Sequence, residues 1–278
     1  MDILLKEHLQ NFASSMRKNI ITLAYHAGKK GAHIAPSLSI VDILAVLYGT
    51  IMHYDSANPF LPERDRFILS KGHGALGYYT ALQQSDIITQ QDLETFEQND
   101  GLFPGQPSMN LAKGIEASSG SLGQGLSLGV GIALAGKKKG MDYRTFVLMG
   151  DGECNEGTIW ESAISAAHFQ LGNLIGIIDR NHMQSDGDSN SIMNLEPFSD
   201  KWSAFGWNVI EADGHSISSL YDAFLQIQQN QRPTVIIAHT TKGYGVSFME
   251  NNNEWHHNHI TDTQYASAMK ELEVLPCR

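Results

Sequence analysis

Three things are scarce in this sequence: cysteine, long apolar runs and positive charge. Its two cysteines, Cys154 and Cys277, fit the spacing of neither a metal motif nor a disulfide framework, which is typical of proteins in a reducing compartment. No apolar stretch reaches the roughly 18 residues that a membrane-spanning helix needs. The N-terminus also lacks the apolar core of a signal peptide. We therefore expect a cytoplasmic protein that does not bind a membrane.

The charge balance excludes a further class of partner. Lys and Arg number 19 against 30 Asp and Glu, which gives a net charge of −11 at pH 7. A chain this acidic is not expected to bind nucleic acid or an anionic membrane, although the local field of a site can still attract a small anion. The sequence has no internal repeat and no Pro/Gly/Ser-rich linker, so we expect one domain over residues 1–278.

Apolar residues recur at helical spacing in the first part of the chain, and after residue 143 strands alternate with helices. A second helix is expected to begin near Ser39, with Asp42 as its capping partner. A polar loop is expected over 246–262, before a short terminal helix. The other helices are expected at 4–27, 73–84, 90–98, 122–137, 156–170, 198–205 and 216–229, and the strands at 66–69, 145–149, 174–179, 207–211 and 234–238. This alternation predicts an α/β fold with a mostly parallel sheet and helices on both faces.

Polar side chains follow four of these expected strands. They lie at 71–73, at Asp151, at 179–181 and at 240–243. Ligands of open parallel sheets bind beyond the carboxyl ends of the strands. The four segments therefore mark a candidate site, although loops are polar in most proteins.

Asp151 and Asn181 sharpen this prediction. They are 30 residues apart, at the ends of two successive strands joined by one helix, and such strands normally lie side by side. A carboxylate, an amide oxygen and a backbone carbonyl suit Mg²⁺ or Ca²⁺, with ligand phosphates completing the shell. Gly150 and Gly152 let backbone approach a phosphate, and a helix beginning near Glu156 would direct N–H groups at it. The pattern predicts a metal–diphosphate clamp; a helix N-cap is the plainer role for Asp151.

A Gly-Asp-Gly segment followed about thirty residues later by Asn is the pattern of thiamine diphosphate enzymes. Across nearly its whole length the chain resembles the N-terminal, diphosphate-binding half of transketolase. The resemblance implies a thiamine diphosphate-binding (PP-domain) fold and thiamine diphosphate with Mg²⁺ or Ca²⁺ as cofactors. It also implies transfer of a two-carbon ketol unit from a ketose, or its phosphate, to an aldose. The matching stretches are GAHIAPSLSIVDIL, RDRFILSKGHG, GIEASSGSLGQGLSLGVGIALA, GDGECNEGTIWESA, IIDRNHMQSDG and TTKGYGVSFMEN.

The resemblance also implies a role for individual residues. The metal ligands would be Asp151, Asn181 and the carbonyl of Met183. The cofactor contacts would be His73, Gly120, Leu122, Gly150, Gly152, Glu153, Asn181 and His256. The catalytic residues would be His33, His73 and His256, together with Glu156 and Glu161 as a carboxylate relay between two active sites, and His33 and Gln106 would contact substrate.

Several of these residues have plainer interpretations. Glu156 and Glu161 fall near the start of an expected helix, where acids are favourable in any case, and His33 could be a turn residue. The group His256, His257 and His259 admits a zinc site, but a phosphate-contacting loop is preferred. Cys154 could be an activated thiolate; a small residue that fills space is the preferred interpretation.

Two departures from the family pattern qualify the resemblance. Gln106 stands where transketolases carry a histidine near the reacting carbon of the donor sugar, and glutamine is neither an acid nor a base near neutral pH. The pyrimidine-binding and C-terminal domains are expected on a separate chain, so this one would be the N-terminal subunit of a split, α₂β₂ transketolase. The alternatives are the α subunit of a 2-oxo acid dehydrogenase and a non-catalytic transketolase-like binding protein.

Overall fold

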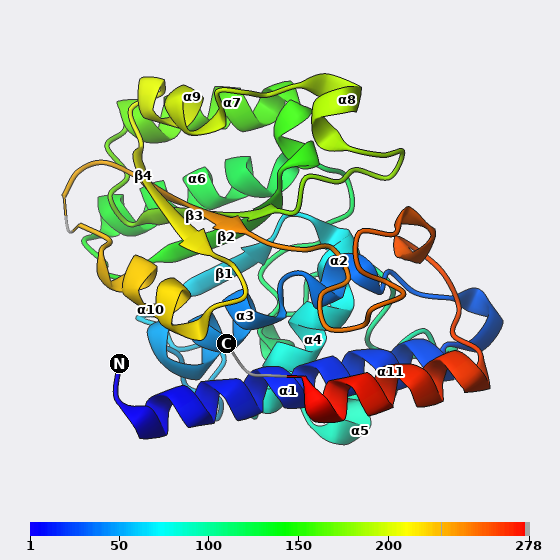
Figure 1. Cartoon of the computed structure of the whole chain (residues 1–278). Helices are drawn as coiled ribbons and strands as arrows, with labels where there is room; N and C mark the ends of the chain where they lie inside the picture. The colour runs from blue at the N-terminus through cyan, green and yellow to red at the C-terminus, as the bar shows by residue number, and fades with distance from the viewer. Residues whose placement is uncertain (229, 276–278) are drawn as a thin grey trace.

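The computed structural model describes residues 1–228 and 230–275, so Cys277 lies outside the described residues. At its centre is a five-stranded sheet in the order β1-β2-β3-β5-β4, with every neighbouring pair parallel (Figure 1). The strands are β1 (Arg66–Leu69), β2 (Thr145–Gly150), β3 (Leu174–Arg180), β4 (Asn208–Asp213) and β5 (Thr234–His239). The expected parallel α/β fold is confirmed.

Helices cover both faces of the sheet (Figure 1). One layer holds α6 (Gln124–Lys139), α7 (Gly157–His168) and α9 (Phe198–Ala204), with the short α8 (Ser189–Met193) beside it. The other holds α1 (Ile3–His26), α2 (Ala35–Leu38), α3 (Val41–Val46), α4 (Ala75–Gln84), α5 (Gln90–Leu93), α10 (Ile217–Leu225) and α11 (Asp262–Val274). None of the described helices is both long enough and apolar enough to cross a membrane.

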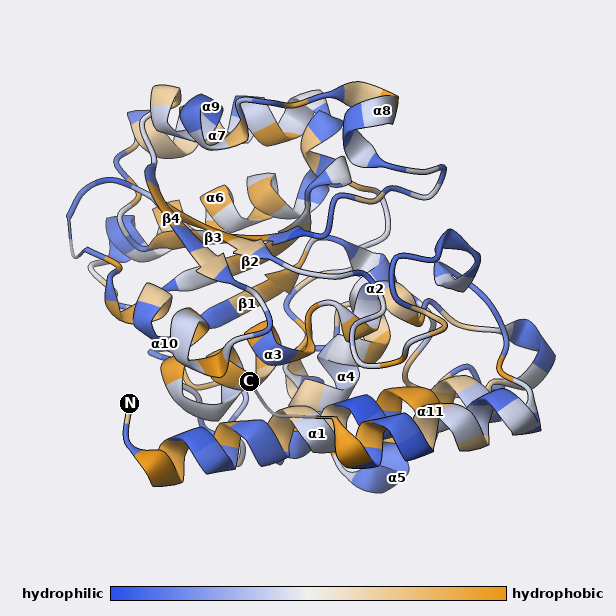
Figure 2. Cartoon of the chain, viewed as in Figure 1, coloured by the Kyte–Doolittle hydropathy of each residue, from blue (hydrophilic) through white to orange (hydrophobic). Residues whose placement is uncertain are grey.

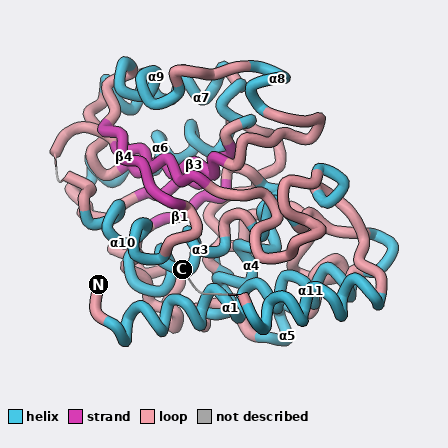
Figure 3. Tube along the Cα trace, viewed as in Figure 1, coloured by secondary structure: helices cyan, strands magenta, loops and turns pink. Residues whose placement is uncertain are grey.

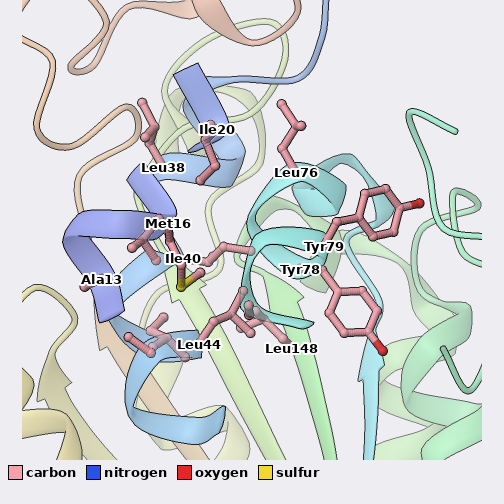
Figure 4. Packing of buried hydrophobic residues seen from close by; sticks show 14 of the residues in the cluster. Ala13, Met16, Ile20, Leu38, Ile40, Leu44, Leu76, Tyr78, Tyr79 and Leu148 are labelled. Carbon is pink, nitrogen blue, oxygen red and sulfur yellow. The ribbon is translucent and has the colours of Figure 1, made fainter. Parts of the chain in front are cut away.

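The central strands are apolar on both faces because each face is covered by helices. Along β2, Phe146 and Leu148 join the buried cluster on the α1 side, whereas Val147 and Met149 join the cluster on the α6 side. Figure 2 shows this apolar character running through the strands, and Figure 4 shows side chains of α1, α3 and α4 converging with Leu148. This alternation fixes which residues stand at the carboxyl ends of the strands.

The predicted helix at Ser39 is wrong in detail. Pro36 lies in the first turn of α2, which ends at Leu38, and α3 begins at Val41. Asp42 caps nothing, because its buried carboxylate accepts hydrogen bonds from Arg17 and from His215. The Ser39 hydroxyl donates to Asp179, 2.7 Å away. Long-range polar partners, which a local capping pattern cannot reveal, decide both positions.

Three other segments differ from expectation. The helix expected over 90–98 is only the four-residue α5, because the chain turns back through positive φ at Glu97 and Asp100. α8 was not expected. The segment over 246–262 is a loop as predicted, but it buries Val246, Met249 and Trp255 under the cluster on the α1 side.

Candidate functional site

An open cavity of about 730 Å³ lies beyond the carboxyl ends of β2 and β3, where the connecting loops gather (Figure 3). Gly150 pairs with Asp179 at the last step of the β2–β3 ladder, so the loops that follow these strands lie side by side. The cavity is lined by Pro36, Lys71, His73, Leu122, Gly150, Asp151, Gly152, Glu153, Asn155, Glu156, Asn181, Met183, Gln184, Ser185, Asp186, Lys242 and His256. Most of the sequence-predicted residues are therefore brought together here.

Asp151 sits at the inner wall and is 2% exposed. One carboxylate oxygen accepts the N–H of Gly152 at 2.8 Å, and the other accepts the N–H of His182 at 2.9 Å. Burial, followed by the nearby charge of Asp179, raises the pKa of Asp151 to about 6. Asp151 also caps the short 3-10 segment Gly152–Asn155, so the plainer N-cap role is present and is compatible with a metal-binding one.

The geometry fits a divalent cation and a bound anion. The Asp151 carboxylate, the Asn181 amide and Met183 line one wall, a set of hard oxygen donors. A cation would relieve the electrostatic strain that raises the Asp151 pKa. Three lining atoms, Asn155 Oδ1, Gln184 Nε2 and His256 Nδ1, are buried without a protein partner, and such atoms are normally satisfied. A polar ligand in the cavity would satisfy them.

Asp179 organises the floor of the site, a role that the sequence did not reveal. Its fully buried carboxylate accepts hydrogen bonds from Lys71 and Thr240, from Ser39 at 2.7 Å and from Asn181 at 2.9 Å. These donors come from four separate segments that meet at the strand ends. Lys71 is the leading attractive charge that lowers the Asp179 pKa against the opposing effect of burial. The only sequence signal was an acid directly after an apolar strand.

Glu153 lines the cavity, but its carboxylate is occupied by protein donors. It accepts the N–H of Gly123 at 2.8 Å, the N–H of Gly150 at 3.0 Å and the hydroxyl of Ser70. Burial raises the Glu153 pKa, while these hydrogen bonds oppose the shift. Glu153 thus ties the loop before α6 to the ends of β1 and β2. The structure shows this bracing role, whereas the cofactor contact expected for Glu153 stays a prediction.

The three histidines singled out from the sequence form one cluster, and His257 joins them. The ring centroids of His33 and His73 are 6.0 Å apart, those of His73 and His256 are 5.2 Å apart, and those of His33 and His257 are 4.6 Å apart. Two backbone hydrogen bonds between Ala32 and Asn258 hold the two segments together. His33 is part of this wall and not merely a turn residue.

The first cause of the pKa shifts in this cluster is burial. It lowers the pKa of His33 to about 4 and that of His256 to about 3, and neighbouring His and Lys groups add to both shifts. The pKa of His73 is lowered well below its ordinary value for the same reason. These imidazoles are therefore neutral at neutral pH. Within the described part of the chain, no group of three or more His, Cys, Asp or Glu side chains is placed to hold a metal, so the zinc alternative gains no support.

Two lysines give the cavity a positive field inside an acidic protein. Lys71 is 1% exposed and is paired with Asp179. The Lys242 ammonium donates to Asn253 Oδ1 at 2.8 Å and to the Gln184 carbonyl at 3.3 Å. Burial, and then the charge of Lys71, lowers the Lys242 pKa to about 8. Both residues were expected at the rim of the site, but no role was assigned to either.

The glycine-rich loop before α6 meets Gln106. Gly120 has φ of +144°, and a Cβ there would lie 1.9 Å from Gln106 Oε1, so only glycine fits this contact. Gly72, next to His73, also packs against Gly120: a Cβ on Gly72 would lie 2.8 Å from the Gly120 nitrogen. The exposed Gln106 amide therefore stands beside the segment that carries His73 and Leu122.

The two glutamates are placed differently from each other. α7 begins at Gly157, so neither Glu156 nor Glu161 lies in its first turn, contrary to expectation. Glu156 is exposed and lines the cavity, whereas Glu161 is exposed on α7 and does not line it. The activated-thiolate interpretation of Cys154 is wrong, because the thiol is fully buried, donates to the Gly150 carbonyl and has its pKa raised by burial.

Comparison with known proteins gives consistent matches. The family model described as the thiamine diphosphate-binding domain of transketolase matches residues 13–276. One of the two named subunits of the apulose-4-phosphate transketolase of Actinobacillus succinogenes is 40% identical over 267 residues, covering 96% of both chains. The 6-deoxy-6-sulfo-D-fructose transketolase subunit of a Clostridium species is 40% identical, covering 95% of this chain and 96% of its own.

Solved structures show the same similarity at the level of the fold. Transketolase from Leishmania mexicana superposes with a TM-score of 0.87 at 28% identity, covering 95% of this chain. Transketolase from Campylobacter jejuni gives 0.87 at 27% identity, covering 98% of this chain. This chain spans 41% and 43% of those two proteins, and nearly the full length of the two relatives that are named as subunits.

Proposed function

This chain belongs to the transketolase family, in its thiamine diphosphate-binding part, and from that premise we propose that it is the N-terminal subunit of a two-subunit transketolase. The observation that carries the proposal is the cavity in which Asp151, Asn181 and Met183 stand together. The full-length match to relatives that are themselves named as transketolase subunits supports the two-chain arrangement.

Thiamine diphosphate and Mg²⁺, or Ca²⁺, are the proposed cofactors. Asp151, Asn181 and the Met183 carbonyl would hold the metal, and Gly150 and Gly152 would let the diphosphate lie against backbone. Lys242, whose ammonium lines the same cavity, would add positive charge toward the diphosphate. The coenzyme, when bound, supplies a carbon nucleophile for cleavage of a carbon–carbon bond next to a carbonyl.

The remaining side chains would orient the reactants and move protons. His33, His73 and His256 are neutral and close together, so each can hydrogen-bond a sugar hydroxyl or accept a proton from it. Gly120 and Leu122 would contact the coenzyme ring region from the loop that Glu153 braces. Gln106 stands beside this loop and would hydrogen-bond the donor sugar, without acting as an acid or base.

The proposed substrates are a ketose donor and an aldose acceptor with an anionic substituent, such as a phosphate. Two observations support this: the lysines of the cavity, and relatives whose names include apulose-4-phosphate and 6-deoxy-6-sulfo-D-fructose. The reaction would belong to carbohydrate metabolism of the pentose phosphate kind and would take place in the cytoplasm.

The proposed assembly is an α₂β₂ heterotetramer in which the partner carries the pyrimidine-binding domain. An uncovered apolar surface supports an interface beside α6 and α7, where Leu128 is 44% and Ile164 is 55% exposed. Glu156 and Glu161 lie on this side of the molecule, one in the cavity and one outside it. This placement is compatible with the proposed carboxylate relay between active sites.

The test is a ketol-transfer assay on the purified chain, alone and with the product of the neighbouring gene, in the presence of thiamine diphosphate and Mg²⁺. The proposal expects activity from the pair and none from the single chain. Full activity of the single chain would refute the two-subunit proposal. Failure of the pair to bind the coenzyme by calorimetry would favour a non-catalytic binding protein.

A further inference from the structure

A buried polar cluster lies beneath the turn 240–245 that follows β5. His215, just after β4, is 6% exposed and lies between α1, α3 and this turn. Its Nδ1 is 3.0 Å from Asp42 Oδ2, and Asp42 is also paired with Arg17. Its Nε2 is 2.7 Å from the backbone nitrogen of Thr241. The cluster is on the far side of the turn from the cavity already described and does not line that cavity.

These contacts fix the proton on the histidine ring. The Thr241 nitrogen can only donate, so Nε2 must accept and carries no hydrogen. The single ring proton of a neutral His215 is then on Nδ1, where it donates to the Asp42 carboxylate. Nδ1 protonation selected by a carboxylate partner is the way proteins orient an imidazole.

The ring is also held in its plane. It stacks on Tyr244 with a centroid separation of 3.7 Å and an interplanar angle of 14°. Gly214, next to it, leaves no room for a side chain, because a Cβ there would lie 2.4 Å from Thr240 Cγ2. The end of β4 is therefore pressed against the turn, and His215 cannot swing away while it keeps both hydrogen bonds.

The turn that His215 holds carries groups of the cofactor cavity. Thr240 donates its hydroxyl to Asp179, and the Gly243 nitrogen donates to the Ala35 carbonyl at 3.0 Å. Lys242, between them, lines the cavity. The His215 contact at Thr241 lies directly before Lys242, on the side of the turn that faces away from the cavity.

We propose that His215 is a positioning residue which, through the Thr241 N–H, sets the place of the Lys242 ammonium in the cofactor cavity. Asp42 and Arg17 hold the imidazole in the Nδ1–H form that this role requires. The inference rests on the proposed function, because Lys242 matters only if an anion binds beside it.

The first experiment is nitrogen NMR of the histidine side chains and backbone amides in the full chain. A protonated Nδ1 and an unprotonated, hydrogen-bonded Nε2 are expected for His215, and His215→Leu should shift the Thr241 and Lys242 amide signals. A protonated Nε2, or unmoved Thr241 and Lys242 signals, would overturn the proposal. This readout needs no cofactor, so it stays decisive even if the proposed function fails.

The second experiment measures thiamine diphosphate affinity by calorimetry with Mg²⁺ and the partner subunit. His215→Leu should weaken binding about 10-fold, the usual scale for supporting residues of a ligand site. His215→Gln, which restores an acceptor near the Nε2 position, should recover much of that loss. In a Lys242→Met background, His215→Leu should change affinity by less than about 2-fold, because the two changes act through one contact.

A stability-matched control separates positioning from general damage. Trp202 is fully buried on the opposite face of the sheet, so Trp202→Leu should lower the unfolding temperature while leaving coenzyme affinity near that of the parent. Equal loss of affinity in Trp202→Leu and His215→Leu would contradict a specific role. So would an undiminished effect of His215→Leu when Lys242 is already replaced. Absence of coenzyme binding in the parent complex would instead refute the proposed function.

Discussion

Replacement of Asp179 by asparagine should be among the most damaging single changes near the site. The carboxylate is 0% exposed and faces Lys71, which is 1% exposed, so the lysine would remain charged and buried without its counter-ion. Removing one partner of such a pair costs about 3–5 kcal/mol. The Asn181, Ser39 and Thr240 donors would also face a weaker acceptor. We expect a loss of about 3–5 kcal/mol from the free energy of unfolding, a large part of the usual total of about 5–15 kcal/mol.

Urea unfolding followed by circular dichroism measures this loss. The matched control is the double variant Asp179→Asn with Lys71→Met, which removes both charges. It should recover at least about 1 kcal/mol relative to Asp179→Asn alone, because no uncompensated charge is left. A loss below about 1 kcal/mol for the single variant, or a double variant no better than it, would refute the view that this ion pair holds the floor of the site.

Three further predictions follow from the cavity walls. Glu153→Gln should weaken coenzyme binding with little change in metal affinity, since it loosens the loop at Gly123; calorimetry with each ligand would show this, and an unchanged coenzyme affinity would count against it. The folded state holds the pKa of His33 and His256 at about 4 and about 3, below their ordinary 6.5, so the unfolded chain binds more protons at pH values between. Stability should therefore fall as the pH drops from 6.5 toward 3, and less steeply in a variant with glutamine at both positions, as acid titration of the unfolding midpoint would reveal. Gln106→His should shift donor preference toward common ketose phosphates in a donor screen; an unchanged ranking would argue against a selective role.

Much of the fold could be predicted because it depends on local patterns. Apolar runs such as Phe146–Met149 predicted the strands, and breakers such as Gly140 marked helix ends. The closeness of Asp151 and Asn181 followed from one rule about parallel strands and was confirmed at the Gly150–Asp179 pairing. These features need only the residues within one strand–helix–strand unit.

The missed features depend on partners far apart in the chain. Asp42 was expected to cap a helix, but Arg17 and His215, on other elements, claim its carboxylate. Asp179 looked like any polar residue after a strand, because its four donors come from four separate segments. No periodic pattern encodes such pairs, and only the folded backbone brings them together.

The resemblance to a family placed residues that patterns alone could not. His33, His73 and His256 are scattered along the chain, and the structure gathers their rings. His257 was expected only as part of a loop, yet its ring contacts His33.

The central claim is that Asp151 and Asn181 share one divalent cation that holds the diphosphate of a coenzyme. Crystals of the chain with its partner subunit, grown with thiamine diphosphate and Mn²⁺, would locate that ion by anomalous scattering. The account predicts one peak in the cavity, about 2.0–2.6 Å from an Asp151 carboxylate oxygen, from Asn181 Oδ1 and from diphosphate oxygens. A peak elsewhere, or one whose shell lacks either side chain while the coenzyme is bound, would contradict it.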